Sequence, residues 1–250
     1  MNQTTVLEKL TNLSYLGFKE AYLRQVEDIS YHSLSFEERV YQLLDAQDIY
    51  IKEKRIQMNH KISKIKDKQA CIEDIDYRVD RGINKTQLHA LVTLDFIRSH
   101  QNIIITGKTG TGKSYLAQAL ANRAIIDGFK SYYVRTPTLL EEIRIARADG
   151  TYTKLLNRYS RFKLLILDDF GVAKMREDDA VNLFEIIEDR TAINSTIITS
   201  QLPVSEWYNY LNNNTIADAI LDRIIHSSHR IELQGESMRK IRSTIKLQGS

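Results

Sequence analysis

A glycine-rich run in the middle of the chain could bind the phosphates of a nucleotide. Its glycines would let backbone amides approach phosphate oxygens without Cβ clashes, and the positive end of a following helix would face the same phosphates. Lys113 could reach the β- and γ-phosphates, and the Ser114 hydroxyl could join a Mg²⁺ shell. The run fits the Walker A pattern without a mismatch, through Gly107, Lys108, Thr109, Gly110, Thr111, Gly112, Lys113 and Ser114.

Two adjacent carboxylates follow an aliphatic run downstream and fit the Walker B pattern. Residues 164–167 are four consecutive aliphatics, which is typical of a strand buried on both faces. Asp168 and Asp169 follow at the carboxyl end of this strand, where ligands bind in open α/β sheets. We expect Asp168 to hold Mg²⁺ and Asp169 to polarise the attacking water. Taken alone, the pair could be two solvated acids that end a strand.

A further strand pattern at 196–199 also ends in polar residues. If this strand lies between the two Walker strands, its tip faces the γ-phosphate. Gln201, or Ser200 beside it, could then orient the water. A simple polar strand end is the alternative.

The elements that must position these residues alternate along the second part of the chain. Helical stretches, such as 114–127, separate the strand patterns, which predicts an α/β fold with a parallel sheet flanked by helices. Residues 1–70 contain one glycine and no proline and predict a small all-helical domain, followed by an ATPase domain at 71–250. The strand patterns lie at 102–106, 131–135, 164–167, 196–199 and 230–233.

The helical region should contain one long helix. Ser35 and Glu38 form a capping box, and no helix breaker follows until well past Lys66, so we expect a helix of roughly 30 residues. A shorter helix is expected around 18–26. The end of the long helix, at 52–68, is basic, and it is either a solvated face or a phosphate-contact surface.

Two helices are expected between the second strand and the Walker B strand, at 137–148 and 153–161. On the second, Lys154, Arg158 and Arg161 fall at i, i+4 and i+7 and form one basic stripe. Arg144 and Arg147 occupy neighbouring positions on the first. We interpret all five as contacts to the DNA backbone, with a solvated face as the alternative. Arg147 borders the apolar side of its helix, where a structural role is the alternative.

Composition excludes several classes of protein. Of the 250 residues, 42% are apolar and 27% charged, as in an ordinary globular protein. The single cysteine, Cys71, excludes an intramolecular disulfide framework and a Cys-rich zinc site. No run of 18 apolar residues and no signal-peptide pattern is present, so we expect a cytoplasmic protein with no membrane span. The net charge of +3 permits a nucleic-acid partner without requiring one.

Beyond the Walker motifs, the chain resembles the IstB family of transposition helper ATPases of bacterial insertion sequences. These are AAA+ proteins related to the DnaC helicase loaders and the DnaA initiators. The resemblance runs from about residue 34 to 240, and the signatures that carry it lie at 34–39, 72–78, 135–137, 146–150, 199–203 and 235–240.

The resemblance implies further roles. ATP and Mg²⁺ are the implied cofactors, and Gln201 occupies the sensor 1 position. Arg223 resembles the arginine finger that reaches a neighbouring subunit's ATP, and Arg239 resembles the sensor 2 arginine of its own subunit. The second Walker B acid is Asp169 rather than the usual Glu, and this shorter side chain fits slow hydrolysis. We expect a truncated C-terminal lid, because about 17 residues follow the last predicted strand.

These observations predict an ATP-dependent, DNA-binding AAA+ ATPase that assembles on target DNA and assists a transposase. The implied partners are double-stranded DNA, bound largely independently of sequence, the cognate transposase, and further copies in a ring or helical assembly. A replicative helicase loader of the DnaC type is the alternative. A small-molecule kinase with the same phosphate-binding loop is a third hypothesis.

Overall fold

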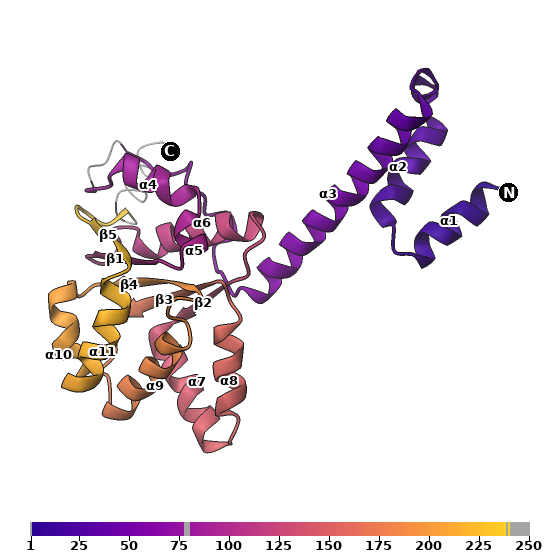
Figure 1. The fold of residues 1–250 in the computed structure, drawn as a ribbon. Helices are drawn as coiled ribbons and strands as arrows, with labels where there is room; N and C mark the ends of the chain where they lie inside the picture. The colour runs from indigo at the N-terminus through magenta and orange to yellow at the C-terminus, as the bar shows by residue number, and fades with distance from the viewer. Residues whose placement is uncertain (1, 78–80, 239, 241–250) are drawn as a thin grey trace. The chain divides into compact units, whose positions relative to one another are not determined.

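The computed structural model describes residues 2–77, 81–238 and 240, and the chain forms two compact units, Met1–Met58 and Asn59–Ser250 (Figure 1). The first unit is helical, as expected. It contains α1 (Gln3–Asn12), α2 (Leu16–Glu27), the 3-10 helix η1 (Ile29–Ser33) and most of α3 (Phe36–Ile62). No helix in the described ranges is both long and apolar enough to cross a lipid bilayer.

Helix α3 begins at the predicted capping box and has 27 residues, close to the expected length. The Ser35 amide donates to Glu38 Oε2 at 2.8 Å, and the Glu38 amide donates to Ser35 Oγ at 3.2 Å. Helix α2 packs closely on α3 at Gly17, where a Cβ would lie 2.5 Å from Ala46 O and from Tyr50 Cβ. The absence of a side chain at Gly17 therefore sets the spacing of this helix pair.

The second unit is built on a five-stranded parallel sheet with the order β2-β3-β4-β1-β5. Each strand confirms one that the sequence predicted. Their bounds are β1 (Asn102–Gly107), β2 (Ser131–Arg135), β3 (Leu164–Phe170), β4 (Ser195–Ser200) and β5 (Ser228–Leu233). Strand β4 lies between the two Walker strands, β3 and β1. Its carboxyl end is therefore expected to face the γ-phosphate.

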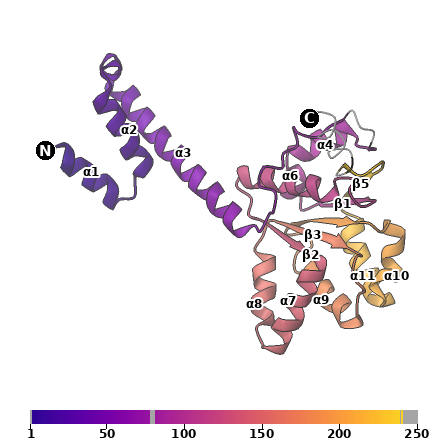
Figure 2. The ribbon, with the colours of Figure 1, turned by 180° about the vertical axis from the view of Figure 1, so that it is seen from behind.

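Helices cover both faces of this sheet (Figures 1 and 2). One face carries α4 (Lys85–Val92), α5 (Asp95–Arg98) and α6 (Lys113–Ile126). The other carries α7 (Thr136–Ala148), α8 (Tyr152–Ser160), α9 (Glu177–Glu188), α10 (Trp207–Leu211), preceded by the 3-10 helix η2 (Val204–Glu206), and α11 (Asn214–Ile225). The predicted helix pair between β2 and β3 is thus present as α7 and α8.

The hydrophobic core lies on both faces of the sheet. Ile103 and Ile105 of β1 and all four aliphatic residues at 164–167 of β3 have no accessible surface. Such continuous apolar runs are the pattern of central strands covered by helices on both sides. The core therefore fixes the strands whose carboxyl ends carry the polar residues.

The boundary between the units lies before the expected position at residue 70, because the segment after α3 packs on α6. The amides of Lys66 and Asp67 both donate to Gln118 Oε1 at 3.0 Å. Asn122 Nδ2 donates to Asp67 O at 3.0 Å and to Ala70 O at 2.8 Å. These long-range contacts make residues 63–70 part of the α/β unit.

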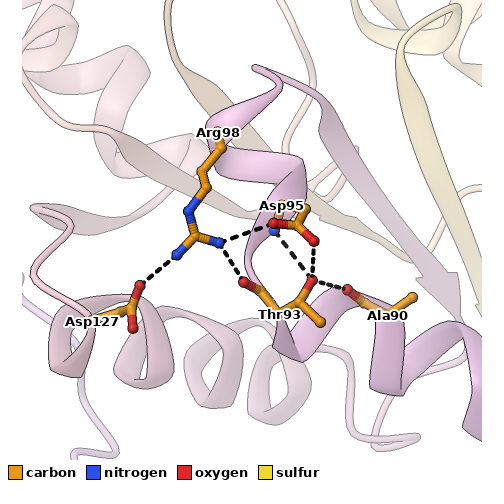
Figure 3. Close-up of polar contacts among 5 residues, drawn as sticks. All are labelled: Ala90, Thr93, Asp95, Arg98 and Asp127. Carbon is orange, nitrogen blue, oxygen red and sulfur yellow. Dashed lines mark hydrogen bonds and ion pairs between the residues drawn. The ribbon is translucent and has the colours of Figure 1, made fainter.

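Arg98 joins the end of α5 to the end of α6 (Figure 3). Its guanidinium donates to Asp127 Oδ2 at 2.9 Å, to Asp95 Oδ1 at 3.1 Å and to Thr93 O at 2.6 Å. Asp95 is exposed and Arg98 and Asp127 are partly exposed, so solvent screens both ion pairs and they contribute little to stability. The contact orients α5 and leaves the opposite end of α6, at the phosphate-binding loop, accessible.

Candidate functional site

The predicted phosphate-binding loop connects β1 to α6. Gly107, Gly110 and Gly112 have φ values of 144°, 84° and 101°, which strongly favour glycine. A Cβ on Gly107 would lie 2.2 Å from Leu233 O, and one on Gly110 would lie 2.1 Å from Ser237 Oγ. The loop thus has the backbone shape that wraps around phosphates, and it ends at the amino terminus of α6.

Lys113 lies inside this loop. Its Nζ donates to Gly107 O at 2.7 Å and to Lys108 O at 2.9 Å. Burial lowers the pKa of Lys113, while the charges of Asp168 and Asp169 oppose this effect. The ammonium is therefore held among loop atoms, where phosphate oxygens would offer it stronger acceptors.

Asp168 is the centre of a hydroxyl cluster at the end of β3. Ser114 Oγ donates to Asp168 Oδ1 at 2.9 Å, and the Thr199 hydroxyl donates to the same oxygen. Tyr133 Oη donates to Oδ2 at 2.5 Å, and burial together with this bond raises the pKa of Tyr133. A serine hydroxyl beside a carboxylate supplies the hard oxygen ligands that Mg²⁺ prefers, so these two residues fit the ion.

Sequence reasoning did not assign Tyr133 and Thr199 to the site. Tyr133 lies in the middle of β2 and Thr199 near the carboxyl end of β4, and each reaches Asp168 from a strand that flanks β3. The alignment of Arg135 with Asp168 and the pairing of β4 with β3 bring these side chains together. Only the order and register of the strands could have revealed them.

Asp169 lies beside Asp168 and is partly exposed. Its backbone φ is 58°, and its amide donates to Thr199 Oγ1 at 3.3 Å. Arg135, at the end of β2, donates from Nε to Asp169 Oδ2 at 2.7 Å. This bond, together with the Asp169 charge, raises the pKa of Arg135. Arg135 is a third residue at the site that sequence reasoning did not assign.

Gln201 follows β4 and faces the phosphate-binding loop. Thr109 Oγ1 donates to Gln201 Oε1 at 2.8 Å, which links the loop to the proposed water-orienting residue. The neighbouring Ser200 is buried and donates to Phe170 O at 2.8 Å. Of the two residues considered for that role, Gln201 alone is exposed at the site.

Arg81 also lies against the loop. It is buried, and its Nη1 would be 3.1 Å from a Cβ on Gly112. Its Nη2 donates to Asp76 O at 2.9 Å, and its carbonyl accepts from the Gln234 amide at 2.9 Å. The structure thus adds a guanidinium beside the loop, and no sequence motif marked it.

Arg223 lies at the opposite edge of the sheet from the loop. Its carbonyl accepts from Nδ2 of Asn102, the first residue of β1, at 3.5 Å. The loop follows the last residue of β1, six residues and about 20 Å away. Arg223 pairs with Glu188, and Nη1 donates to Ala219 O at 3.0 Å. Arg223 is therefore remote from the nucleotide site of its own chain, and Arg239 lies outside the described residues.

Arg190 is a further arginine of the α/β unit, and its burial excludes a role as an arginine finger. It is 2% exposed, and it donates to Tyr159 O at 2.7 Å, to Phe162 O at 2.8 Å and to Thr196 Oγ1 at 3.1 Å. Burial lowers the pKa of Arg190 to about 9. This side chain joins the turn after α8 to β4 and is inaccessible to another subunit.

Two of the expected DNA contacts have partners within the fold. Arg144 Nε and Nη2 donate to the two oxygens of buried Asp179 at 3.0 and 2.7 Å. Arg147 donates to Asn182 Oδ1 and to Glu185 Oε1, at 3.0 and 3.1 Å. Both arginines thus join α7 to α9, and DNA contact by either remains a prediction.

The stripe on α8 is more accessible. Lys154 and Arg161 are exposed and have no ion pair within the described ranges. Arg158 pairs with Glu142, and its guanidinium carbon lies 4.8 Å from the centre of the Tyr159 ring. The structure therefore presents Lys154 and Arg161 as accessible cations, with Arg158 partly neutralised between them.

The family of this chain follows from comparison with known proteins. Residues 8–245 match the family model for IstB-like ATP-binding proteins. The chain belongs to the IstB family. Its members include the insertion-sequence ATP-binding protein y4pL of Sinorhizobium fredii, which is 39% identical over 94% of this chain and 95% of its own length. The chain is accordingly an AAA+ ATP-binding protein of the insertion-sequence type.

Solved structures share the fold of this family member. The DnaI structure aligns with a TM-score of 0.58 at 22% identity, over 67% of this chain and 92% of its own. A DnaA structure bound to AMPPCP and single-stranded DNA aligns with a TM-score of 0.53 at 19% identity. The alignment covers 72% of this chain and 55% of the DnaA chain. These likenesses confirm the predicted AAA+ fold.

Proposed function

We propose that this IstB-family protein hydrolyses ATP with Mg²⁺, assembles on duplex DNA when ATP is bound, and assists the transposase of its insertion sequence in the cytoplasm. The observation that carries the proposal is the position of Arg223. The phosphate-binding loop, Asp168 and Asp169 lie at the carboxyl ends of the strands. Arg223 lies at the amino end of β1. With Arg223 as the arginine finger, a complete site would take its residues from two copies.

Each residue at the loop has a role that its position supports. Backbone amides and Lys113 would bind the phosphates, and Ser114 with Asp168 would hold Mg²⁺, which would supply positive charge to the phosphoryl group. Gln201 positions the attacking water next to the loop, where it already contacts Thr109. Asp169 accepts the proton of that water.

The trans role of Arg223 would couple ATP to assembly. A contact that uses one surface on the first copy and a different surface on the second is heterologous, and it builds rings or helical filaments. Arg223 must leave Glu188 before it can reach a neighbouring nucleotide. ATP supplies the anion that competes with Glu188, so nucleotide binding would favour the assembled state.

DNA binding is proposed through α8. Lys154 and Arg161 are exposed, and Arg158 lies on the same stripe. Lysines and arginines on a helix face contact phosphates, which carry no sequence information, so binding should be largely independent of sequence. Assembly along a duplex would repeat this weak contact in every copy.

A pair of measurements tests the proposal. ATP hydrolysis should rise when duplex DNA of unrelated sequence is added, whereas a small-molecule kinase would show no response to DNA. The tagged protein with ATP should capture the transposase encoded by the same insertion sequence and not the replicative helicase of its host. Capture of the helicase alone would favour the helicase loader instead.

A further inference from the structure

A broad groove, the basic groove, lies beside α8 in the α/β unit. Its volume is about 1110 Å³. Six cations line it, and its lining contains no Asp or Glu. The cations are Lys61 at the end of α3, Lys64 in the following loop, Lys130 before β2, and Lys154, Arg158 and Arg161 on and after α8.

The floor of the basic groove is apolar. It contains Ile62, Tyr132, Leu155 and Phe162, and the rings of Tyr132 and Phe162 pack with centroids 4.6 Å apart. Glu142 pairs with Arg158, and the other five cations have no ion pair within the part of the chain that the structure describes. Like charges gathered around an apolar floor favour an occupant that is both acidic and apolar.

Duplex DNA supplies negative charge but few apolar groups that could fill such a floor. A peptide segment with acids on both sides of large apolar side chains supplies both. The apolar floor and the three lysines outside α8, Lys61, Lys64 and Lys130, therefore favour a protein segment here, while the α8 stripe stays assigned to DNA.

The helical unit of the same chain carries a segment with these properties. Residues 26–38, the acidic tip, contain Glu27, Asp28, Glu37 and Glu38 and no Lys or Arg. The acidic tip includes η1, which connects α2 to α3 (Figure 1). Ile29 and Phe36 are 79% and 76% exposed there, the highest values among the large apolar residues of the described chain.

We propose that the acidic tip of one copy docks in the basic groove of a neighbouring copy. The large apolar side chains of the tip cover the apolar floor, and its acids pair with Lys61, Lys64 and Lys130. An exposed aromatic residue in an apolar depression is the usual anchor of such a contact. The proposal rests on the self-assembly proposed above and names a surface that would carry it.

This contact has consequences for assembly. Every copy carries both surfaces, so docking of tip into groove is heterologous and propagates from copy to copy. The contact is separate from the ATP–Arg223 contact, because the basic groove contains neither the phosphate-binding loop nor Arg223. Two independent contacts between neighbours would stabilise an assembly that each one alone holds weakly.

Cross-linking between two full-length chains tests the docking. In a Cys71→Ser background, one chain carries Ile29→Cys and the other, with a larger tag, carries Asn157→Cys, which lines the basic groove. A short bismaleimide should join the mixed chains into a heterodimer. A control chain with Lys9→Cys, an exposed site on α1, should cross-link far more slowly. Absence of the heterodimer would overturn the proposal.

Charge reversal supplies a second readout. Glu27→Lys with Glu37→Lys should slow heterodimer formation by about 10–100-fold, as expected when complementary charges are lost at an interface. Lys61→Glu with Lys130→Glu on the partner should restore it. Reversal at Lys9 and Lys174, two exposed lysines outside both surfaces, should change little. An unchanged rate in the tip variant would overturn the proposal.

DNA occupancy is the competing outcome. If Lys61→Glu with Lys130→Glu weakens duplex binding in fluorescence anisotropy and leaves cross-linking to the wild-type tip unchanged, the basic groove is a DNA site and the docking proposal fails. Mixtures of Arg223→Ala and Asp169→Asn chains test the proposed function independently of the docking. Restored ATPase activity in these mixtures would support the role of Arg223 between copies. Restoration without the heterodimer would overturn the docking alone.

Discussion

Arg135 Nε lies 2.7 Å from Asp169 Oδ2, so the expected catalytic carboxylate is already hydrogen-bonded by a residue of the neighbouring strand. Strand pairing fixes this relationship, because Arg135 and Asp168 are in register across β2 and β3. One of the two oxygens that would accept the water's proton is thereby occupied. In the proposed mechanism, release of Asp169 by Arg135 would free this oxygen for the proton of the water.

We predict that Arg135→Ala raises ATP hydrolysis measured without DNA by about 2–10-fold, the equivalent of one hydrogen bond of about 0.5–1.5 kcal/mol. Arg135→Lys keeps the charge and should stay closer to the wild-type rate. Phosphate release at saturating ATP is the measurement. A fall in the rate of Arg135→Ala would show that Arg135 supports hydrolysis rather than restraining it.

Nucleotide binding and hydrolysis should separate in two variants. Lys113→Ala removes the ammonium from the loop and should weaken ATP binding by about 10–100-fold. Asp169→Asn should bind ATP normally and hydrolyse it at least about 100-fold more slowly, because an amide cannot accept the water's proton. A filter assay with labelled ATP and a phosphate-release assay measure the two effects. Normal hydrolysis by Asp169→Asn would remove this residue from the mechanism.

Arg223→Ala should bind ATP almost normally and hydrolyse it about 1,000-fold more slowly, the effect expected of an arginine finger. Mixing it with Asp169→Asn should restore part of the activity, because some interfaces then combine an intact Arg223 with an intact Asp169. Glu188→Gln is the matched control, since it removes the ion-pair partner and keeps Arg223. Co-assembly of the mixed chains without any restored activity would contradict a role in trans.

Lys154→Ala with Arg161→Ala should weaken duplex binding equally on unrelated sequences. These two cations are exposed and have no ion pair in the described ranges, so their loss should leave the fold intact. Each lost phosphate contact lowers the slope of log affinity against log salt by about 0.9. Fluorescence anisotropy across a salt series measures this slope, with Lys174→Ala as the control. An unchanged slope would move the DNA surface away from α8.

Stability should fall in alkaline solution because of three tyrosines. Burial, followed by hydrogen bonds to Asp168, Glu185 and Glu142, raises the pKa of Tyr133, Tyr152 and Tyr159. Above about pH 10 the unfolded chain loses these protons and the folded chain keeps them. The unfolded state then binds fewer protons, so the free energy of unfolding decreases as pH rises.

Absorbance at 295 nm should show that part of the 13 tyrosines of the folded protein resists ionisation at pH 10–11 and ionises on unfolding. Tyr152→Phe should flatten the decline of Tm with pH. Ionisation of every tyrosine near pH 10, with circular dichroism unchanged, would contradict the prediction.

The sequence by itself determined the parts of this protein that depend on neighbouring residues. The phosphate-binding loop, the acidic pair after β3 and the capping box of α3 are all local patterns, and the structure confirms their placement. A continuous aliphatic run also marked β3, because a strand covered on both faces has no polar position. The family could be recognised for the same reason, since short signatures carried the resemblance.

Only the tertiary structure decided which side chains meet. Strand order and register bring Tyr133 and Thr199 to Asp168, and Arg135 to Asp169. These partners lie more than 30 residues apart in the sequence, so local spacing does not predict their contacts.

The same limit applies to the arginines. Three arginines look alike in the sequence but differ in the structure. Arg144 pairs with buried Asp179, and Arg190 lies buried among carbonyls. Arg223 pairs with Glu188 near the amino end of β1. The role of a charged side chain depends on its burial and on its partners. Packing between distant segments sets both, and residue type and spacing do not encode that packing locally.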